Sequence, residues 1–149
     1  MDSDEIAHRL GQLETECRRR GLPVTAQRQY ILQEILQRDD HPSADQIYTA
    51  VKNRIPGLSR TTVYRVLDTL AQFGLVRRLH HPGTTARFDG RTRRHHHLVC
   101  RQCEQVIDIE LAALDKLPLP RLIQDGFEIE DYSVHFVGLC AQCQQKHGR

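Results

Sequence analysis

The chain has 149 residues, of which 39% are hydrophobic and none is tryptophan, so two domains of half that length would each have a thin apolar core. No apolar run approaches the roughly 18 residues of a membrane span, and the charged start MDSDEIAHRL lacks the apolar core of a signal peptide. These features exclude a membrane-spanning protein, and we expect a cytoplasmic one. A formal net charge of +2 is too small by itself to indicate a nucleic-acid partner.

Hydrophobic periodicity predicts four helices in the first part of the chain. Each begins at a hydroxyl side chain, and the third has a capping box made by Ser43 and Gln46. Cys17 lies on the apolar stripe of the first helix and is predicted to be a small core residue. The helices are bounded by Ser3 and Gly21, Thr25 and Gln37, Ser43 and Pro56, and Ser59 and Gly74.

The fourth helix has one apolar stripe and one polar face that carries few charges. Two β-rich pieces follow, LVRRLH and TTARFD, and the turn His81-Pro82-Gly83 between them predicts a hairpin. Three compact helices, a polar-faced fourth and a hairpin are typical of a winged helix-turn-helix that reads DNA with its fourth helix, although such cores also occur as protein-interaction modules. The candidate DNA contacts are Ser59, Thr61, Thr62, Tyr64, Arg65 and, on the second helix, Arg28; each could also be ordinary surface.

The polar stretch 90–94 is predicted to be a hinge between a winged-helix domain, residues 1–89, and a small α/β domain, residues 95–149. After two strands around a first C-x-x-C motif, this second domain is predicted to contain a helix at 111–117, a shorter helical piece ending at 125 and strands within 127–139. The expected fold class is therefore α+β.

Two C-x-x-C motifs provide four thiols: Cys100, Cys103, Cys140 and Cys143. In a reducing cytosol this spacing indicates metal binding rather than disulfides, and four thiolates are the donor set of a structural Zn²⁺ site. Such a site would stabilise a domain whose core is thin.

A run of three histidines precedes Cys100. If Arg101 and Gln102 turn the chain, the flanking strands pair so that His95 lies opposite Asp108 and His97 opposite Val106. His95, His97 and Asp108 would then converge on one face as a second metal site without thiolates, while His96 faces away. The remaining histidines are predicted to be ordinary residues that are either on the surface or satisfied by hydrogen bonds: His8, His80, His81, His135 and His147.

The motifs HPSADQIY, TTVYRVLDTL, ARFDG, HHHLVCRQC and CAQC occur in an order that resembles the ferric uptake regulator (Fur) family of bacterial metal-dependent repressors. The resemblance implies a homodimer that binds double-stranded operator DNA, with 95–149 as the dimerisation domain and one structural Zn²⁺ in each chain. It also implies that the regulatory metal ligands are His41, Asp89, His95, His97 and Asp108.

Three nitrogens and two carboxylates without sulfur favour Fe²⁺ or Mn²⁺ at this second site. Asp at both 89 and 108 resembles the peroxide-responsive branch of the family, in which iron-catalysed oxidation of a ligand histidine releases the DNA. The resemblance makes His41 and His95 the candidates for that oxidation. Tyr64-Arg65 instead resembles the recognition helix of the iron-responsive branch.

Three alternatives stay open. The protein could be an iron-responsive regulator without peroxide sensing or a zinc-sensing repressor. It could also be a non-haem iron enzyme, because two histidines and a carboxylate form the metal triad of such oxygenases. The winged helix argues against an enzyme, as does the absence of an H-E-x-x-H motif.

Overall fold

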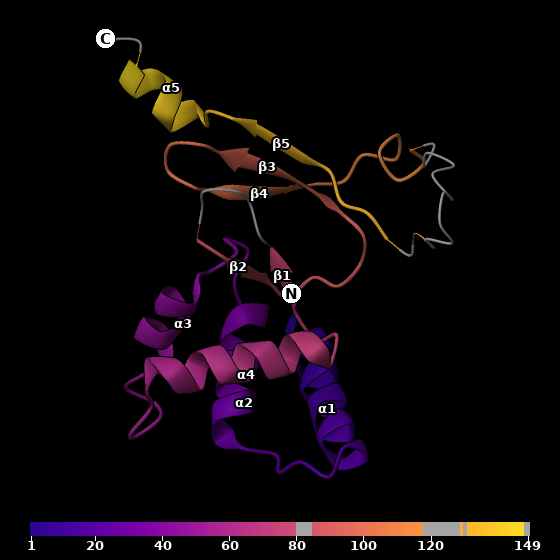
Figure 1. The fold of residues 1–149 in the computed structure, drawn as a ribbon, viewed down its shortest axis with the longest axis vertical. Helices are drawn as coiled ribbons and strands as arrows, with labels where there is room; N and C mark the ends of the chain where they lie inside the picture. The colour runs from indigo at the N-terminus through magenta and orange to yellow at the C-terminus, as the bar shows by residue number, and fades with distance from the viewer. Residues whose placement is uncertain (80–84, 118–128, 130, 148–149) are drawn as a thin grey trace. The chain divides into compact units, whose positions relative to one another are not determined.

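The computed structural model describes residues 1–79, 85–117, 129 and 131–147. The chain forms two compact units, Met1–Thr92 and Arg93–Arg149. Figure 1 labels their elements, and each unit is described by itself. In the part of the chain that the structure describes, no helix is long and apolar enough to cross a membrane.

The first unit contains the four predicted helices, which the structure confirms. Their bounds are α1 Ser3–Arg19, α2 Ala26–Leu36, α3 Ala44–Val51 and α4 Arg60–Gln72. Side chains cap all four, and the capping box of Ser43 and Gln46 is complete. The helix α3 ends before the predicted Pro56, because the chain after Val51 continues in a tighter turn in which the Arg54 N–H donates to the Val51 carbonyl at 2.9 Å.

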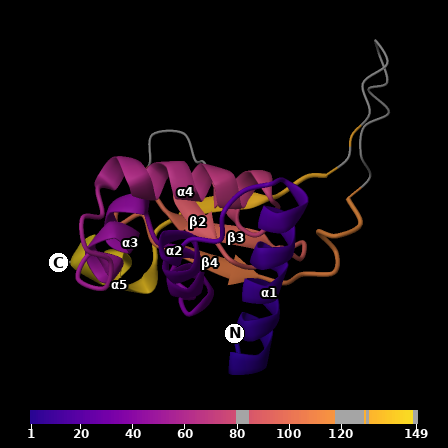
Figure 2. The same ribbon diagram turned by 90° about the horizontal axis from the view of Figure 1, so that it is seen from below.

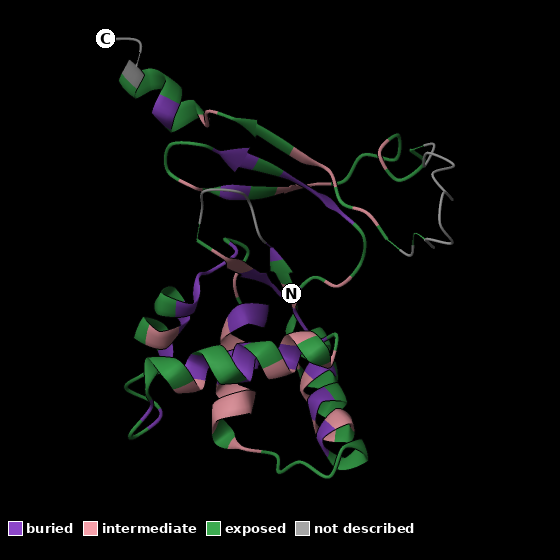
Figure 3. Ribbon diagram, in the orientation of Figure 1, coloured by how far each residue is buried: buried purple, intermediate pink, exposed green. Residues whose placement is uncertain are grey.

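The core of this unit lies between the apolar stripes of the helices. In Figures 1 and 2, α4 lies against α2 and α3, and Figure 3 shows the buried stripe of each helix. Cys17 is fully buried in this core, as predicted. The largest members of the core cluster are Leu13, Ile31, Leu32, Ile35, Leu36, Ile47, Leu67, Leu70 and Phe88.

The predicted hairpin is confirmed as two antiparallel strands, β1 Arg77–Leu79 and β2 Arg87–Asp89, and its turn at 81–83 lies outside the described residues. The chain before α3 is attached to β2, since Ser43 forms a bridge with Arg87 and the Phe88 N–H donates to the Pro42 carbonyl at 3.0 Å. Four helices followed by this hairpin form the winged helix-turn-helix.

The second unit is a three-stranded sheet in the order β4-β3-β5, with a short helix after it. Its elements are β3 His96–Cys100, β4 Val106–Ile109, β5 His135–Gly138 and α5 Ala141–His147. The strand β3 pairs with β4 antiparallel and with β5 parallel. Together the units give the expected α+β class.

Two predictions for this unit are wrong. The residues of the predicted helix at 111–117 form turns instead, with one hydrogen bond of 2.8 Å from the Leu114 N–H to the Leu111 carbonyl. The register also differs, because His97 rather than His95 lies opposite Asp108. The predicted helical piece ending at 125 lies outside the described residues.

The register differs because the turn between β3 and β4 is longer than predicted. The Cys100 N–H donates to the Gln105 carbonyl at 2.9 Å, so the turn contains residues 101–104 rather than Arg101 and Gln102 alone. Glu104 adopts a left-handed conformation with φ 58°. This change moves the pairing by two residues, and an even shift keeps every side chain on its predicted face.

Candidate metal centres

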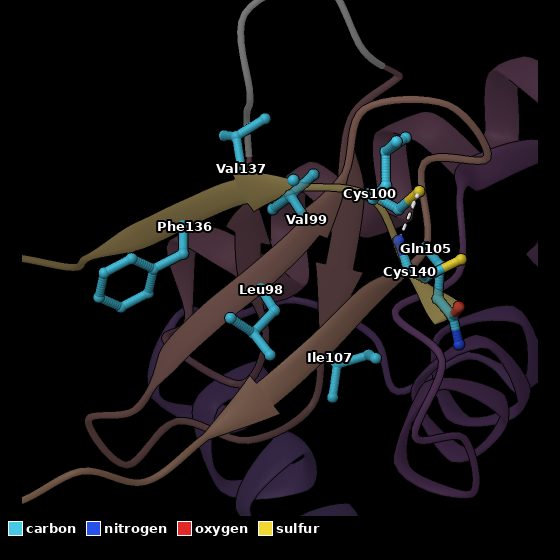
Figure 4. Close-up of a pocket in the computed structure, with 10 residues that line it drawn as sticks. Leu98, Val99, Cys100, Gln105, Ile107, Phe136, Val137 and Cys140 are labelled. Atoms are coloured by element: carbon cyan, nitrogen blue, oxygen red, sulfur yellow. Dashed lines mark hydrogen bonds between the residues drawn. The ribbon is translucent and has the colours of Figure 1, made fainter. Parts of the chain in front are cut away.

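The four cysteines of the two C-x-x-C motifs lie together. Cys100 ends β3 and Cys103 lies in the turn after it, while Cys140 precedes α5 and Cys143 lies in its first turn. Their four Sγ atoms lie within 4.8 Å of one another, and the Cys140 N–H donates to the Cys100 Sγ at 3.4 Å (Figure 4). The parallel pairing of β5 with β3 therefore joins the two motifs.

The spacing of these sulfur atoms fits a tetrahedral metal. A Zn–S bond of about 2.3 Å places two thiolates of a tetrahedron about 3.8 Å apart. The Sγ atoms of Cys103 and Cys140 are 3.7 Å apart, which is far beyond a disulfide bond of about 2.05 Å. The residues present therefore fit one Zn²⁺.

The ionisation of the thiols also favours a cation. Backbone N–H groups of Cys103, Cys140 and Gln102 donate to the Cys100 sulfur and lower its pKa to about 6. Burial, followed by hydrogen bonds with the neighbouring thiols, raises the pKa of Cys143 to about 12. A second negative charge in the cluster is thus unfavourable unless a cation compensates it.

A second group of ligand-type side chains lies on the other end of β3. The Nε2 atoms of His95 and His97 are 3.0 Å apart, and the Asp108 Oδ1 lies 3.5 Å from the first and 3.7 Å from the second. Both histidines are buried. The convergence predicted from the sequence therefore occurs, although through the corrected register.

The nitrogen atoms of this group are oriented for a metal. The His95 Nδ1 is 2.8 Å from the Arg93 carbonyl, and a carbonyl only accepts, so Nδ1 carries the proton and Nε2 has the lone pair. Two ligands with metal–nitrogen bonds of about 2.1 Å lie about 3.0 Å apart at a right angle and about 3.4 Å apart in a tetrahedron. The two nitrogens, 3.0 Å apart, are close to the right-angle value, and the Asp108 oxygen at 3.5 and 3.7 Å is closer to the tetrahedral one, so the donor types rather than the spacing indicate the metal.

His41 and Asp89 belong to the first unit, where both are buried. The His41 Nε2 is 3.9 Å from the Asp89 Oδ1, and the attachment of residues 42–43 to β2 places the two side chains beside each other. His41 has φ 49°, a conformation that a residue other than glycine adopts rarely and mostly where a site requires it.

His96 lies on the opposite face of the sheet from His97, as predicted. Its Nδ1 accepts from the Val134 N–H at 3.2 Å, so its Nε2–H donates to Asp115, also at 3.2 Å. Its ring lies against that of Tyr132, which the guanidinium of Arg94 covers at 4.7 Å from the ring centroid. His96 thus has hydrogen-bond partners on both ring nitrogens.

His135 is a neighbour of the second group that the sequence did not reveal. The parallel register pairs it with His97, and the two rings stack at 5.3 Å between centroids with planes 9° apart. His135 is partly buried, and its Nε2 lies 2.9 Å from the Ser133 hydroxyl, which agrees with the prediction of a satisfied histidine. The signal for this contact is indirect, because a metal shared by the two C-x-x-C motifs places the strand before Cys140 beside the strand that ends at Cys100.

The polar face of α4 is exposed at its centre. Thr61, Tyr64 and Arg65 are exposed, whereas the hydroxyl groups of Ser59 and Thr62 lie 2.9 Å apart and belong to the helix cap. The Arg28 guanidinium donates to the Pro23 carbonyl. Of the six candidate DNA contacts, three are therefore available without rearrangement.

Residues 19–137 match the model of the ferric uptake regulator family. The peroxide-responsive repressor PerR of Staphylococcus aureus (strain Mu50 / ATCC 700699) is 30% identical over 98% of this chain and 99% of its own length. The Fur structure of Pseudomonas aeruginosa with manganese is 31% identical, with a TM-score of 0.67 over 86% of this chain and 97% of that one.

The Fur structure of Helicobacter pylori has the same fold, with a TM-score of 0.80 and 18% identity over 93% of each chain. The matched residues contain α2, α3, α4, the hairpin, the histidine run and the first C-x-x-C motif, whereas Cys140 and Cys143 follow them in the chain. The chain belongs to the ferric uptake regulator family.

Proposed function

We propose that this protein is a metal-dependent repressor in which Fe²⁺ or Mn²⁺ at a regulatory site promotes binding to operator DNA. The convergence of His95, His97 and Asp108 carries the proposal, because two ring nitrogens 3.0 Å apart and a carboxylate oxygen 3.5 and 3.7 Å from them form a donor set without sulfur. His41 and Asp89 would supply the other ligands. The relative from P. aeruginosa, whose structure contains manganese, supports a metal of this type.

The proposed ligands come from both units of the chain. His41 and Asp89 belong to Met1–Thr92, and the other three belong to Arg93–Arg149. A metal bound by all five would stabilise one arrangement of the units over others. The DNA-binding equilibrium can shift only by the difference in metal affinity between these arrangements, commonly about 1–3 kcal/mol.

The exposed face of α4 is the proposed reading surface. Tyr64 and Arg65 offer a hydroxyl and a guanidinium that can contact base edges and phosphates in the major groove, and Thr61 adds a further hydroxyl. Ser59, Thr62 and Arg28 are proposed as phosphate contacts near the helix ends. We place the repressor in the cytoplasm, where its DNA lies.

We propose that a second copy of the chain covers one face of the C-terminal sheet. Leu98, Ile107 and Phe136 lie on neighbouring strands of this face and are 40–44% exposed, and Figure 4 shows them together. A group of exposed apolar side chains of this kind marks an interaction surface. Two copies would also present two α4 helices to successive turns of the major groove.

Phe136→Asp is expected to dissociate this homodimer, because the carboxylate would lose water on the apolar face without gaining a partner. Sedimentation velocity at micromolar concentration should show a dimer for the wild type and a monomer for the variant. Lys146→Asp is a matched control, since Lys146 is exposed on α5 and lies outside this face. A dimer that survives Phe136→Asp would contradict the proposed surface.

The peroxide-responsive reading is favoured over the iron-responsive one. Both proposed carboxylate ligands are Asp, and the PerR relative covers almost the whole chain. A zinc-sensing repressor is less favoured, because the proposed donor set of three nitrogens and two carboxylates lacks thiolates. The relative of this chain from S. aureus is a repressor, so we assign the metal site a sensing role rather than substrate turnover.

His97→Ala is expected to abolish metal activation of DNA binding. With duplexes selected from a random library by the Mn²⁺-loaded protein, fluorescence anisotropy should show at least a roughly tenfold gain in wild-type affinity on adding Mn²⁺. The variant should bind these duplexes equally weakly with and without Mn²⁺. His8→Ala, at an exposed position on α1, should behave like the wild type. Full activation of His97→Ala would refute the proposed site.

A further inference from the structure

Arg9 is a buried arginine on the apolar stripe of α1. It is 8% exposed and, with Leu13 and Cys17, it is one of the buried residues of this helix. A guanidinium is costly to bury without hydrogen-bond acceptors, so its position demands partners. The sequence contains a signal for it, since Arg9 is three residues after Ile6 and four before Leu13, where the helical period predicts an apolar side chain.

The partners of Arg9 lie on both sides of the hairpin. Its Nη1–H donates to the Gly90 carbonyl at 3.1 Å and lies 3.5 Å from the Thr92 Oγ1, and its Nη2–H donates to the Leu75 carbonyl. Leu75 precedes β1, and Gly90 directly follows β2. One guanidinium therefore connects α1 to both ends of the hairpin.

Gly90 also packs against side chains of the core. A Cβ atom at this position would lie 3.0 Å from the Leu36 Cδ2 and 3.3 Å from the Met1 Cε, so only glycine fits without displacement. Gly90 thus packs closely against the end of α2, and its carbonyl accepts from the guanidinium of Arg9. The chain that leaves β2 has little freedom at this point.

This segment orients Asp89. The backbone N–H of Arg91, between Gly90 and Thr92, donates to the Asp89 Oδ1 at 2.7 Å. The guanidinium of Arg9 contacts Gly90 and Thr92, the two residues next to Arg91. Burial lowers the pKa of Arg9, and the negative charges of Glu5 and Asp89 act in the opposite direction.

We propose that Arg9 is a positioning residue for the regulatory metal site, which fixes Asp89 through Gly90, Thr92 and the Arg91 N–H. It does not contact the metal itself. The proposal rests on the proposed function, because it needs Asp89 to be a ligand. Through Arg9, the first helix of the DNA-binding unit becomes part of the sensor.

Arg9→Met tests the proposal, because methionine keeps an unbranched apolar stem and removes the donors. Loss of a group that orients a ligand typically weakens metal binding by about 10–100-fold, and we expect at least about tenfold weaker Mn²⁺ binding by isothermal titration calorimetry. Arg9→Lys is a milder variant that keeps the charge, and it should also weaken binding, because one ammonium group cannot replace the guanidinium fork.

Arg18→Met is the matched control. Arg18 lies on the same helix, 77% of its side chain is exposed, and it forms an ion pair with Glu14, one turn earlier. This variant loses the same charge as Arg9→Met but keeps the contacts of Arg9. It should therefore bind Mn²⁺ like the wild type. Equal Mn²⁺ affinity in the wild type and in a folded Arg9→Met or Arg9→Lys variant would overturn the proposal.

A double-mutant cycle separates positioning from a general loss of stability. If Arg9 acts through Asp89, then adding Arg9→Met to Asp89→Asn should change the Mn²⁺ affinity by less than about twofold. An undiminished effect in that background would overturn the proposal. If Asp89→Asn alone leaves the Mn²⁺ affinity unchanged, the ligand assignment of the proposed function fails instead, and the inference about Arg9 falls with it.

Discussion

Cys140→Ser is expected to unfold the unit Arg93–Arg149 while the winged helix stays folded. Among its described residues, the buried hydrophobic side chains are Val99, Val106, Cys100 and Cys143, and half of these are cysteines of the cluster. A sheet with so small a core depends on the cross-link between β3 and α5. A structural Zn²⁺ contributes on the order of 10 kcal/mol to such domains, which exceeds what this core supplies.

Three measurements check this expectation. The zinc content of the purified protein should fall from one equivalent per chain to near zero, the far-ultraviolet circular dichroism should lose its strand contribution, and sedimentation should show a monomer. Removing zinc from the wild type with a strong chelator at neutral pH should produce the same changes. Cys17→Ala removes a thiol outside the cluster and should keep the zinc. A stable zinc-free dimer of Cys140→Ser would contradict the structural role.

The first unit was predictable because its signals are local. Each helix begins at a side chain that caps its own first turn, and the buried stripes repeat with the helical period. Ser43 and Gln46 illustrate this, since both hydrogen bonds of their box lie within four consecutive residues. Such interactions depend little on the rest of the fold.

The second unit was less predictable because its contacts are distant in sequence. The length of the turn after β3 could not be predicted from the C-x-x-C spacing, because Cys103 lies within the turn rather than at its end. The face of each histidine was nevertheless correct, because a shift of two residues preserves strand alternation. The parallel pairing that places His135 beside His97 had only an indirect signal, which is the metal shared by the C-x-x-C motifs that follow the two strands.

His41 shows a similar limit in the first unit. Only the resemblance to the family indicated it, because a His-Pro pair in a loop carries no ligand signal. The structure supplies a physical account: residues 42–43 are attached to β2, and His41 has a left-handed backbone that places its side chain beside Asp89. Its conformation depends on a strand more than 40 residues later in the chain.

Hydrogen peroxide is expected to inactivate the Fe²⁺-loaded protein by oxidising a histidine of the regulatory site. In the overall reaction, one peroxide oxygen is inserted into an imidazole C–H bond and the other leaves as water, so each oxidised ring consumes one peroxide. The oxidised ring is a poorer nitrogen donor, so metal affinity and with it DNA affinity should be lost. Peptide mass spectrometry should find one added oxygen atom on His41 or His95, and anisotropy should show release of the selected duplex.

The Mn²⁺-loaded protein is the first control, because Mn²⁺ does not readily reduce peroxide, and it should keep both its mass and its DNA. Asp108→Glu is the second. A longer carboxylate moves the donor oxygen relative to the two Nε2 atoms, from which it is now 3.5 and 3.7 Å distant. This variant should retain metal-activated DNA binding and show less histidine oxidation at equal peroxide. Oxygen found only on Met1 or on the cysteines would instead favour the iron-responsive reading, since sulfur oxidation needs no ligand histidine.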